Sequence, residues 1–405
     1  MMVVKEHNLS NEEVMRYSRQ ILVEEFGVQG QERLRSTSLL IIGAGGLGCP
    51  VALYCAGAGI GRIGIVDGDF VSSDNLHRQI AYGEQSVGQS KAESMKSSIE
   101  RLNSNVRIDV YKDFLFQRNA LHIISDYDIV ADCTDNVSTS YVFFWFLTKA
   151  PIIEYLINDA CILTKKPLVS GSVVRWDGQL SVYGYGKDCP CYRCVFPDPP
   201  SMNAVTNCSD NGVLGPVVGI IGTSFAGFLY LFDAFNGKAK TIKLRHQKAS
   251  CAVCGENATI TELGDCKKLY GCSNRKCVKN KLLAKSDRVD PYIYFKLSEN
   301  RTKKQLLIDT RPPHEFNIGH LPNAINIPVV RLFLSTSADI IRELKTDINE
   351  MENKGVYVIC RRGEDSQIAV QYLRKKFADY SISIKDIDGG YEKWSNVVDK
   401  DFPIY

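Results

Sequence analysis

The 405-residue sequence has no large excess of either charge, because 49 Lys and Arg residues stand against 46 Asp and Glu residues, for a net charge of +3. That balance does not require a nucleic acid or an acidic membrane surface as a partner. Residues 1–20 lack the basic segment and apolar run of a signal peptide, and no repeat of solenoid period is present. We therefore expect a cytosolic protein with no direct nucleic-acid partner and no membrane partner.

The 14 cysteines occur without a signal-peptide pattern, so metal ligands or reactive thiols explain them better than a secreted disulfide framework. The rest of the composition is ordinary for a globular protein, with 44% hydrophobic and 23% charged residues. The length leaves room for two or three domains.

A glycine-rich segment, SLLIIGAGGLG at residues 38–48, predicts a buried strand, a tight loop and the start of a helix. N–H groups at the start of such a helix bind phosphate. The loop glycines are Gly43, Gly45, Gly46 and Gly48.

Two further predicted strands end in carboxylates. The strand at residues 60–66 leads to Asp67 and Asp69, which are placed to accept hydrogen bonds from a ribose, and the strand at residues 128–134 leads to Asp135. Strands that alternate with helices predict an α/β fold with a Rossmann-like, doubly wound and mostly parallel sheet. Both NAD and ATP fit these features.

Two cations favour ATP over NAD. Arg78 in NLHRQ and Lys91 in VGQSK follow the ribose-binding acids, and a triphosphate needs such charges beyond the glycine loop. Asp135 would then be a ligand of Mg²⁺, which prefers carboxylate oxygens. Each residue taken alone could equally be a solvated surface charge.

Six motifs together resemble the ubiquitin-activating-enzyme-like adenylyltransferases typified by bacterial MoeB and ThiF, over about residues 10–260: RYSRQI, GAGGLG, DGD, NLHRQ, GQSK and DCTDN. The resemblance implies that Arg78 and Lys91 contact the triphosphate of ATP, that Asp67 and Asn75 line the nucleotide site, and that Asp135 helps to hold Mg²⁺. Arg19 matches an arginine that reaches into the partner subunit's site, which implies a homodimer.

Two C-x-x-C pairs predict a metal site without the family. Cys191 and Cys194, with Cys251 and Cys254, supply the four thiolates of a closed structural Zn²⁺ site, one ion per chain. A redox C-x-x-C is the alternative. Between the pairs, Cys208 lies in the polar segment TNCSDNGVLG and could be a spare thiol. The resemblance implies instead that Cys208 acts on the activated C-terminus, through a thioester or a disulfide.

The C-terminal part of the chain predicts a second domain after a lysine-bearing linker at residues 261–300. There CRRGEDSQ, at residues 360–367, joins a buried strand to a helix, so N–H groups, the helix dipole and two arginines would favour a thiolate at Cys360. A buried core cysteine is the alternative. Together with QLLIDTR and GHLPNAINIP, the loop resembles a rhodanese domain at residues 301–405, which implies that Cys360 carries a persulfide.

The whole arrangement, with an adenylyltransferase domain at residues 1–260, resembles the fused eukaryotic adenylyltransferases and sulfurtransferases of molybdenum cofactor synthesis and tRNA wobble-uridine thiolation. The resemblance implies adenylation of the C-terminal glycine of ubiquitin-like sulfur carriers ending in Gly-Gly, followed by sulfur transfer to give a thiocarboxylate. These carriers would be the small subunit of molybdopterin synthase and the ubiquitin-related modifier, with a persulfide donor such as a cysteine desulfurase. The alternative is a partner-binding scaffold that has lost adenylation and retains only rhodanese activity; a dehydrogenase is more distant.

One segment departs from the family pattern. Residues 140–154 insert an apolar run shortly after Asp135, too short for the roughly 20 apolar residues of a membrane span. It is either an additional contact surface or translated intron sequence, and it brings the expected Mg²⁺ and ATP geometry into question.

Overall fold

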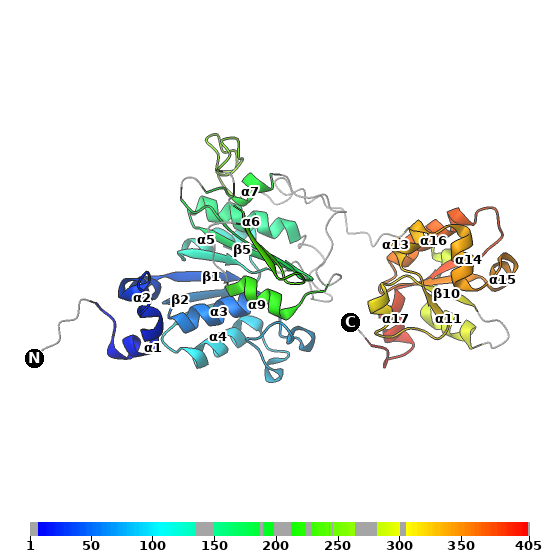
Figure 1. Cartoon of the computed structure of the whole chain (residues 1–405), viewed down its shortest axis with the longest axis horizontal. Coiled ribbons are helices and arrows are strands. Elements are labelled where there is room, and N and C mark those ends of the chain that lie inside the picture. Colours follow the sequence, from blue (N-terminus) through cyan, green and yellow to red (C-terminus); the bar gives the residue numbers. More distant parts are fainter. Residues whose placement is uncertain are drawn as a thin grey trace, which may run out of the picture. The chain divides into compact units, whose positions relative to one another are not determined.

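An eight-stranded sheet organises the first of the two units into which the chain divides, Met1–Asn274 and Arg275–Tyr405 (Figure 1). The computed structural model describes residues 7–134, 150–186, 189–197, 212–223, 229–242, 244, 246–263, 282–299 and 305–403. Asp135, Cys208 and most of the 140–154 segment lie outside these residues.

The first sheet has the strand order β3-β2-β1-β4-β5-β6-β7-β8. Neighbouring strands are parallel from β3 to β5 and antiparallel from β5 to β8. The predicted α/β class and mostly parallel Rossmann-like sheet are therefore confirmed. The strands are β1 (Ser38–Ile42), β2 (Arg62–Val66), β3 (Arg107–Tyr111), β4 (Ile129–Asp132), β5 (Leu168–Val174), β6 (Asp177–Tyr183), β7 (Leu229–Asp233) and β8 (Lys238–Ile242).

Helices cover both faces of this sheet, as the alternation of side chains along a strand requires. On β1, Ile41 packs with the core under α3, α4 and α9, whereas Leu40 and Ile42 pack with α5 and α6 on the other face (Figure 1). The helices of this unit are α1 (Asn11–Ile21), α2 (Gly27–Ser36), α3 (Gly48–Ala58), α4 (Lys91–Leu102), α5 (Gln117–Ser125), α6 (Ala150–Leu163), α7 (Tyr192–Val195) and α9 (Gly215–Thr223).

The second unit is built on a parallel five-stranded sheet of order β11-β10-β12-β13-β9. Its strands are β9 (Arg288–Val289), β10 (Leu306–Asp309), β11 (Ala324–Asn326), β12 (Val356–Ile359) and β13 (Ile384–Ile387). Its helices are α11 (Pro291–Ser298), α12 (Pro313–Phe316), α13 (Val329–Leu334), α14 (Ser337–Leu344), α15 (Ile348–Lys354), α16 (Asp365–Lys376) and α17 (Gly390–Val397).

Residues 288–298, which the sequence places in the linker, form β9 and α11 of this second unit. Val289 and Tyr294 are buried there against Ile387 and Trp394. The lysines at residues 267–285 led us to expect a linker up to residue 300, although the short apolar segment that follows these lysines belongs to the core. The part of the chain that the structure describes contains no helix with the length and hydropathy of a membrane span.

Candidate functional site

The glycine-rich loop lies between β1 and α3, at the point where the strand order reverses. β1 pairs in parallel with both β2 and β4, so connections leave its end in opposite directions and open a crevice there. Two glycines are required by close contacts. A Cβ on Gly43, whose φ is +95°, would lie 2.7 Å from the Cys133 carbonyl oxygen, and one on Gly48 would lie 2.1 Å from that of Gly43.

Buried side chains hold this loop in place. Ala44 N–H donates to Asp67 Oδ2 at 2.7 Å, Asp69 N–H donates to Asp67 Oδ1 at 2.7 Å, and Tyr82 donates to the Ala44 carbonyl at 2.6 Å. Burial raises the pKa of Asp67, while nearby Lys91 lowers it. Asp67 thus fixes the glycine loop through Oδ2 and the segment after β2 through Oδ1, and a bond from Asp67 to a ribose stays a prediction. Tyr82 belongs to none of the sequence motifs.

Lys91 is the first residue of α4 and faces the same edge of the sheet. Its Nζ lies 3.1 Å from Asp69 Oδ2, and its backbone N–H donates to the Asp69 carbonyl at 2.9 Å. The Lys91 side chain is only 6% exposed. This ion pair holds a cation at the carboxyl end of β2, beside the acids that follow the strand.

Arg78 lies beside the glycine loop. Its Cγ would be 3.5 Å from a Cβ placed on Gly46, and its guanidinium donates to Asn75 Oδ1 at 2.7 Å. Asn75 is the buried last residue of a 3-10 turn, Ser73–Asn75. The structure thus gathers the loop, both acids, Asn75 and both cations at one edge of the sheet.

Arg19 lies at the opposite end of α3 from the loop. It is exposed on α1, and Tyr17 of the same helix packs against Gly59, the residue that caps the C-terminus of α3. The loop precedes the N-terminus of α3, an 11-residue helix about 16 Å long. Arg19 is therefore not placed to serve the nucleotide site of its own chain.

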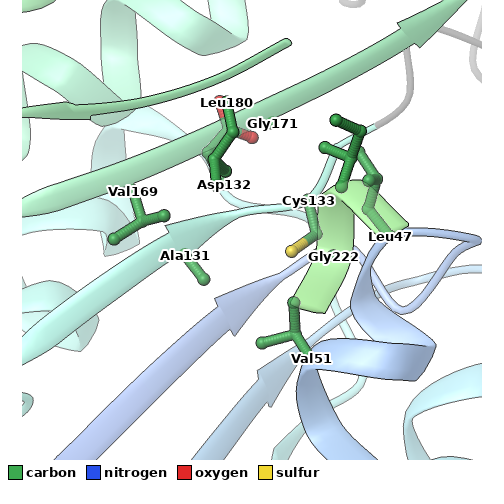
Figure 2. A pocket seen from close by; sticks show the side chains of 10 residues that line it. Leu47, Val51, Ala131, Asp132, Cys133, Val169, Gly171, Leu180 and Gly222 are labelled. Atoms are coloured by element: carbon green, nitrogen blue, oxygen red, sulfur yellow. The ribbon is translucent and has the colours of Figure 1, made fainter. Parts of the chain in front are cut away.

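A pocket adjoins the glycine loop on the side of α9 (Figure 2). Apolar side chains form most of its wall, among them Leu47 of the glycine loop, Val51 of α3 and Leu180 of β6. Asp132 is its one ionisable carboxylate. Burial, and then Glu154, raise the pKa of Asp132 to about 7, although Thr134 donates to its Oδ1 twice, at 2.7 and 3.1 Å.

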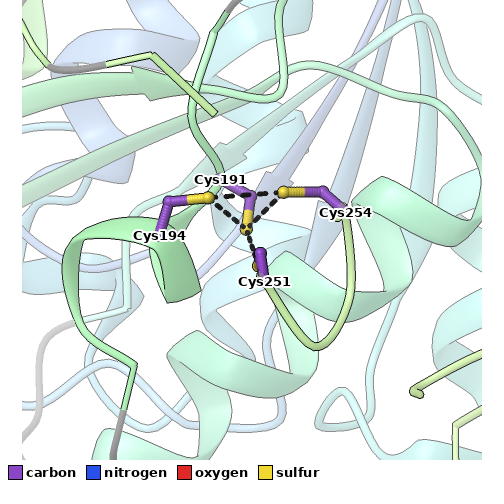
Figure 3. A group of neighbouring side chains, drawn as sticks. All are labelled: Cys191, Cys194, Cys251 and Cys254. Atoms are coloured by element: carbon purple, nitrogen blue, oxygen red, sulfur yellow. Dashed lines mark hydrogen bonds between the residues drawn. The ribbon is translucent and has the colours of Figure 1, made fainter. Parts of the chain in front are cut away.

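The four predicted metal-binding cysteines converge, although about 60 residues separate the two pairs (Figure 3). Their sulfurs contact one another at 3.4, 3.5 and 3.9 Å and all lie within 4.8 Å. A tetrahedron of Zn–S bonds places sulfurs about 3.8 Å apart, whereas a disulfide needs about 2.05 Å. Burial and the three neighbouring thiols raise the pKa of Cys191, as expected where thiolates need a cation between them.

Residues of helix α6 bond the two residues between Cys191 and Cys194. Asp159 accepts two hydrogen bonds from Arg193, each at 2.7 Å, and Asn158 Oδ1 accepts from the Tyr192 N–H at 2.8 Å. The Asp159 and Arg193 side chains are 0% and 6% exposed, and the guanidinium lies over the Tyr155 ring. The four-cysteine cluster is therefore tied to the core through a buried ion pair that the sequence alone did not indicate.

Cys360 follows β12 and precedes α16, as the sequence predicts. The thiol is 3% exposed, and the Gly363 N–H donates to its Sγ at 3.0 Å. Burial raises the pKa of Cys360, against the lowering effects of Ser366 and the Gly363 N–H. The hydrogen bonds of the loop therefore reduce the rise in the pKa of Cys360 that burial causes. Contrary to our expectation from the sequence, they do not lower this pKa below its ordinary value.

Known proteins match both units. Residues 17–245 match the ThiF family, and residues 296–397 match the rhodanese-like domain. The chain is 47% identical to adenylyltransferase and sulfurtransferase MOCS3 of Caenorhabditis briggsae, over 98% of each chain. It is 43% identical to the protein of that name from Sus scrofa, over 98% of this chain and 89% of that one.

The chain therefore belongs to the ThiF family and to its branch that carries a C-terminal rhodanese-like domain. It is an adenylyltransferase and sulfurtransferase, and its family uses ATP. The resemblance drawn from the motifs is confirmed.

Proposed function

We propose that the first unit uses ATP and Mg²⁺ to adenylate the C-terminal glycine of ubiquitin-like sulfur carriers ending in Gly-Gly, with release of pyrophosphate. The second unit then supplies sulfur to form a C-terminal thiocarboxylate. The carriers are the small subunit of molybdopterin synthase and the ubiquitin-related modifier, so the products serve molybdenum cofactor synthesis and tRNA thiolation. The proposal rests on one observation: a glycine loop flanked by Lys91 and Arg78 stands in one chain with the Cys360 loop.

The residues around the loop divide the work on ATP. Loop N–H groups and the N-terminus of α3 receive phosphate oxygens, while Arg78 and Lys91 offset the charge that develops as pyrophosphate leaves. Asp69 keeps the Lys91 ammonium at this edge, 3.1 Å from its own carboxylate. Asp135 is the proposed Mg²⁺ ligand; it lies outside the described residues.

Sulfur follows a separate route. Cys360 accepts a sulfane sulfur from a donor such as a cysteine desulfurase and delivers it to the activated carboxylate. Joining both units in one chain raises the effective concentration of this second step. Cys208, also outside the described residues, would hold the activated carrier between the two steps as a thioester or disulfide.

Zn²⁺ has a structural role in this proposal. The sulfur separations fit a closed four-thiolate site, which leaves no position for a substrate. The exposure of Arg19 beyond the far end of α3 supports a homodimer in which each arginine serves the partner's nucleotide.

ATP–pyrophosphate exchange in the presence of a Gly-Gly-ended carrier tests adenylation. We expect exchange by the wild type and none by Lys91→Ala, because the lost ammonium offsets the charge that develops on the leaving pyrophosphate. Lys96→Ala is the matched control, since Lys96 lies on the same helix with a side chain 37% exposed and is 3.9 Å from Glu100. If Lys91→Ala exchanges pyrophosphate at the wild-type rate, Lys91 does not act on the phosphates of ATP. Absence of exchange in the wild type favours the scaffold that retains only rhodanese activity.

Mass spectrometry of the carrier tests sulfur transfer. With ATP and thiosulfate, Cys360→Ala should form no thiocarboxylate but should still adenylate. Cys208→Ala should retain both partial reactions and lose the overall conversion, whereas Cys189→Ala, outside the metal cluster, should behave as the wild type.

A further inference from the structure

A chain of hydrogen bonds leads inward from the Cys360 thiol. Cys360 Sγ donates to Ser366 Oγ at 3.4 Å, and Ser366 Oγ donates to Asp386 Oδ2 at 3.3 Å. Ser366 and Asp386 are both 0% exposed. The thiol is thus connected to a carboxylate that water does not reach.

Arg288 fixes that carboxylate. Its Nε lies 3.0 Å from Asp386 Oδ1 and its second guanidinium nitrogen 2.8 Å from Oδ2. The same nitrogen donates to the Gly363 carbonyl at 3.1 Å, in the loop whose N–H contacts Cys360 Sγ. Arg288 and Asp386 are direct partners in the register of β9 and β13, so the sheet itself aligns the pair.

We propose that Ser366 and Asp386 form a proton relay that generates the Cys360 thiolate for sulfur transfer, with Arg288 as the residue that positions Asp386. Ser366 both receives and donates, so one hydroxyl can pass the proton along. Gly363 N–H then stabilises the sulfur anion that remains.

The proton and electron balance is simple. The Cys360 thiol proton moves to Ser366 Oγ as the Ser366 hydroxyl proton moves to Asp386 Oδ2, leaving a thiolate and a neutral carboxylic acid. The thiolate attacks the outer sulfur of a donor persulfide, R–S–SH. A new S–S bond forms on Cys360 as the old S–S bond breaks, and R–S⁻ leaves with the electron pair, so no external oxidant or reductant is needed.

The surroundings favour moving one proton between the two groups over ionising both. Burial raises the pKa of Asp386, and Arg288 only partly offsets it. Charged groups lie on the elements around this chain of hydrogen bonds. They are Arg288 and Asp290 around β9, Lys385, Asp386 and Asp388 of the β13 segment, Glu392 and Lys393 of α17, Arg361, Arg362 and Glu364 of the loop, and Asp365, the first residue of α16. Lys393 is held by Asp290 and Asp388, at 2.8 and 2.9 Å.

The experiment is alkylation of Cys360 by iodoacetamide in the full chain, followed across pH by peptide mass spectrometry. Ser366→Ala and Asp386→Asn should each slow alkylation at neutral pH by about tenfold, the effect of a one-unit rise in the pKa of the thiol. Ser366→Thr should restore the rate, because it restores the hydroxyl. Asp388→Asn is the matched control: Asp388 also pairs with Arg288, at 2.7 Å, but its side chain is 37% exposed.

The sign of the Asp386→Asn effect is decisive. If Asp386 acted only as a fixed negative charge, its neutralisation would favour the thiolate and speed alkylation, which would overturn the relay. An unchanged rate in Ser366→Ala overturns it as well, and that variant decides the matter if Asp386→Asn does not fold.

This inference rests on the proposed persulfide role of Cys360, and the two fail differently. Sulfur transfer by Cys360→Ala would refute that role. Loss of transfer in Cys360→Ala, together with wild-type alkylation in Ser366→Ala and Asp386→Asn, would refute the relay alone.

Discussion

Replacing Asp159 with Asn should destabilise the first unit and loosen its metal site. The change leaves the Arg193 guanidinium, 6% exposed, without the carboxylate that accepts both of its 2.7 Å hydrogen bonds. Breaking a buried ion pair from one side costs about 3–5 kcal/mol. The contact of the guanidinium with the Tyr155 ring, 4.6 Å away, is present in both proteins and does not change this difference. Because the new amide oxygen can still accept one hydrogen bond from Arg193, we expect a loss of about 3 kcal/mol in the free energy of unfolding, at the lower end of that range.

Urea unfolding measures this loss, and zinc release to a chromogenic chelator measures the effect on the cysteines. Asp113→Asn is the matched control, because Asp113 pairs with Arg118 at 3.4 Å with both side chains more than half exposed. That pair should contribute less than about 1 kcal/mol. If Asp159→Asn lowers the free energy of unfolding no more than Asp113→Asn does, the buried ion pair does not have the stabilising role assigned to it. Replacing both partners, with Arg193→Met added to Asp159→Asn, should recover part of the loss, since no unpaired charge then remains buried.

Three further predictions concern the first unit. Metal analysis should find one zinc per chain, and Cys194→Ser or Cys254→Ser should lose it with a lowered melting temperature; a metal-free wild type of equal stability would contradict the site. Burial raises the pKa of Asp132 to about 7, so the ionised carboxylate destabilises the folded protein. This loss of unfolding free energy is absent below pH ~4, grows as pH rises and reaches up to about 4 kcal/mol above pH ~7. Asp132→Asn should therefore flatten the dependence of unfolding free energy on pH between those limits, and an unaltered slope would refute the shift. Gly48→Ala should abolish pyrophosphate exchange, because its Cβ would lie 2.1 Å from a backbone oxygen of the glycine loop; retained exchange would show that the loop tolerates displacement.

Sequence patterns succeeded where function depends on neighbours along the chain. The run from Ser38 to Gly48 predicts its strand, loop and helix start, and β1 and α3 have those positions in the structure. The strand and helix around Cys360 are likewise β12 and α16. In both cases a buried apolar strand, glycine and the start of a helix are adjacent, so local pattern and local structure coincide.

Patterns failed where partners are distant. Tyr82 holds the Ala44 carbonyl from 38 residues away, and Arg288 meets Asp386 from 98 residues away. Nothing in the composition around Arg288 distinguishes it from the other charges in the expected linker. Only the pairing of β9 with β13 makes it part of the rhodanese-like unit.

The strand, glycine loop and helix start at residues 38–48, the two C-x-x-C pairs and the thiol at the head of its loop could be read from the sequence alone, because each is a pattern of residues with fixed spacing. What those groups face depends on the tertiary structure: Asp67 accepts from the glycine loop through one oxygen and from the Asp69 N–H through the other, Asp159 pairs with an arginine beside the four-cysteine cluster, and Asp386 lies at the end of a hydrogen-bond chain from Cys360. Burial and hydrogen-bond partners set the protonation and orientation of these carboxylates, and both arise only when distant strands and helices pack together.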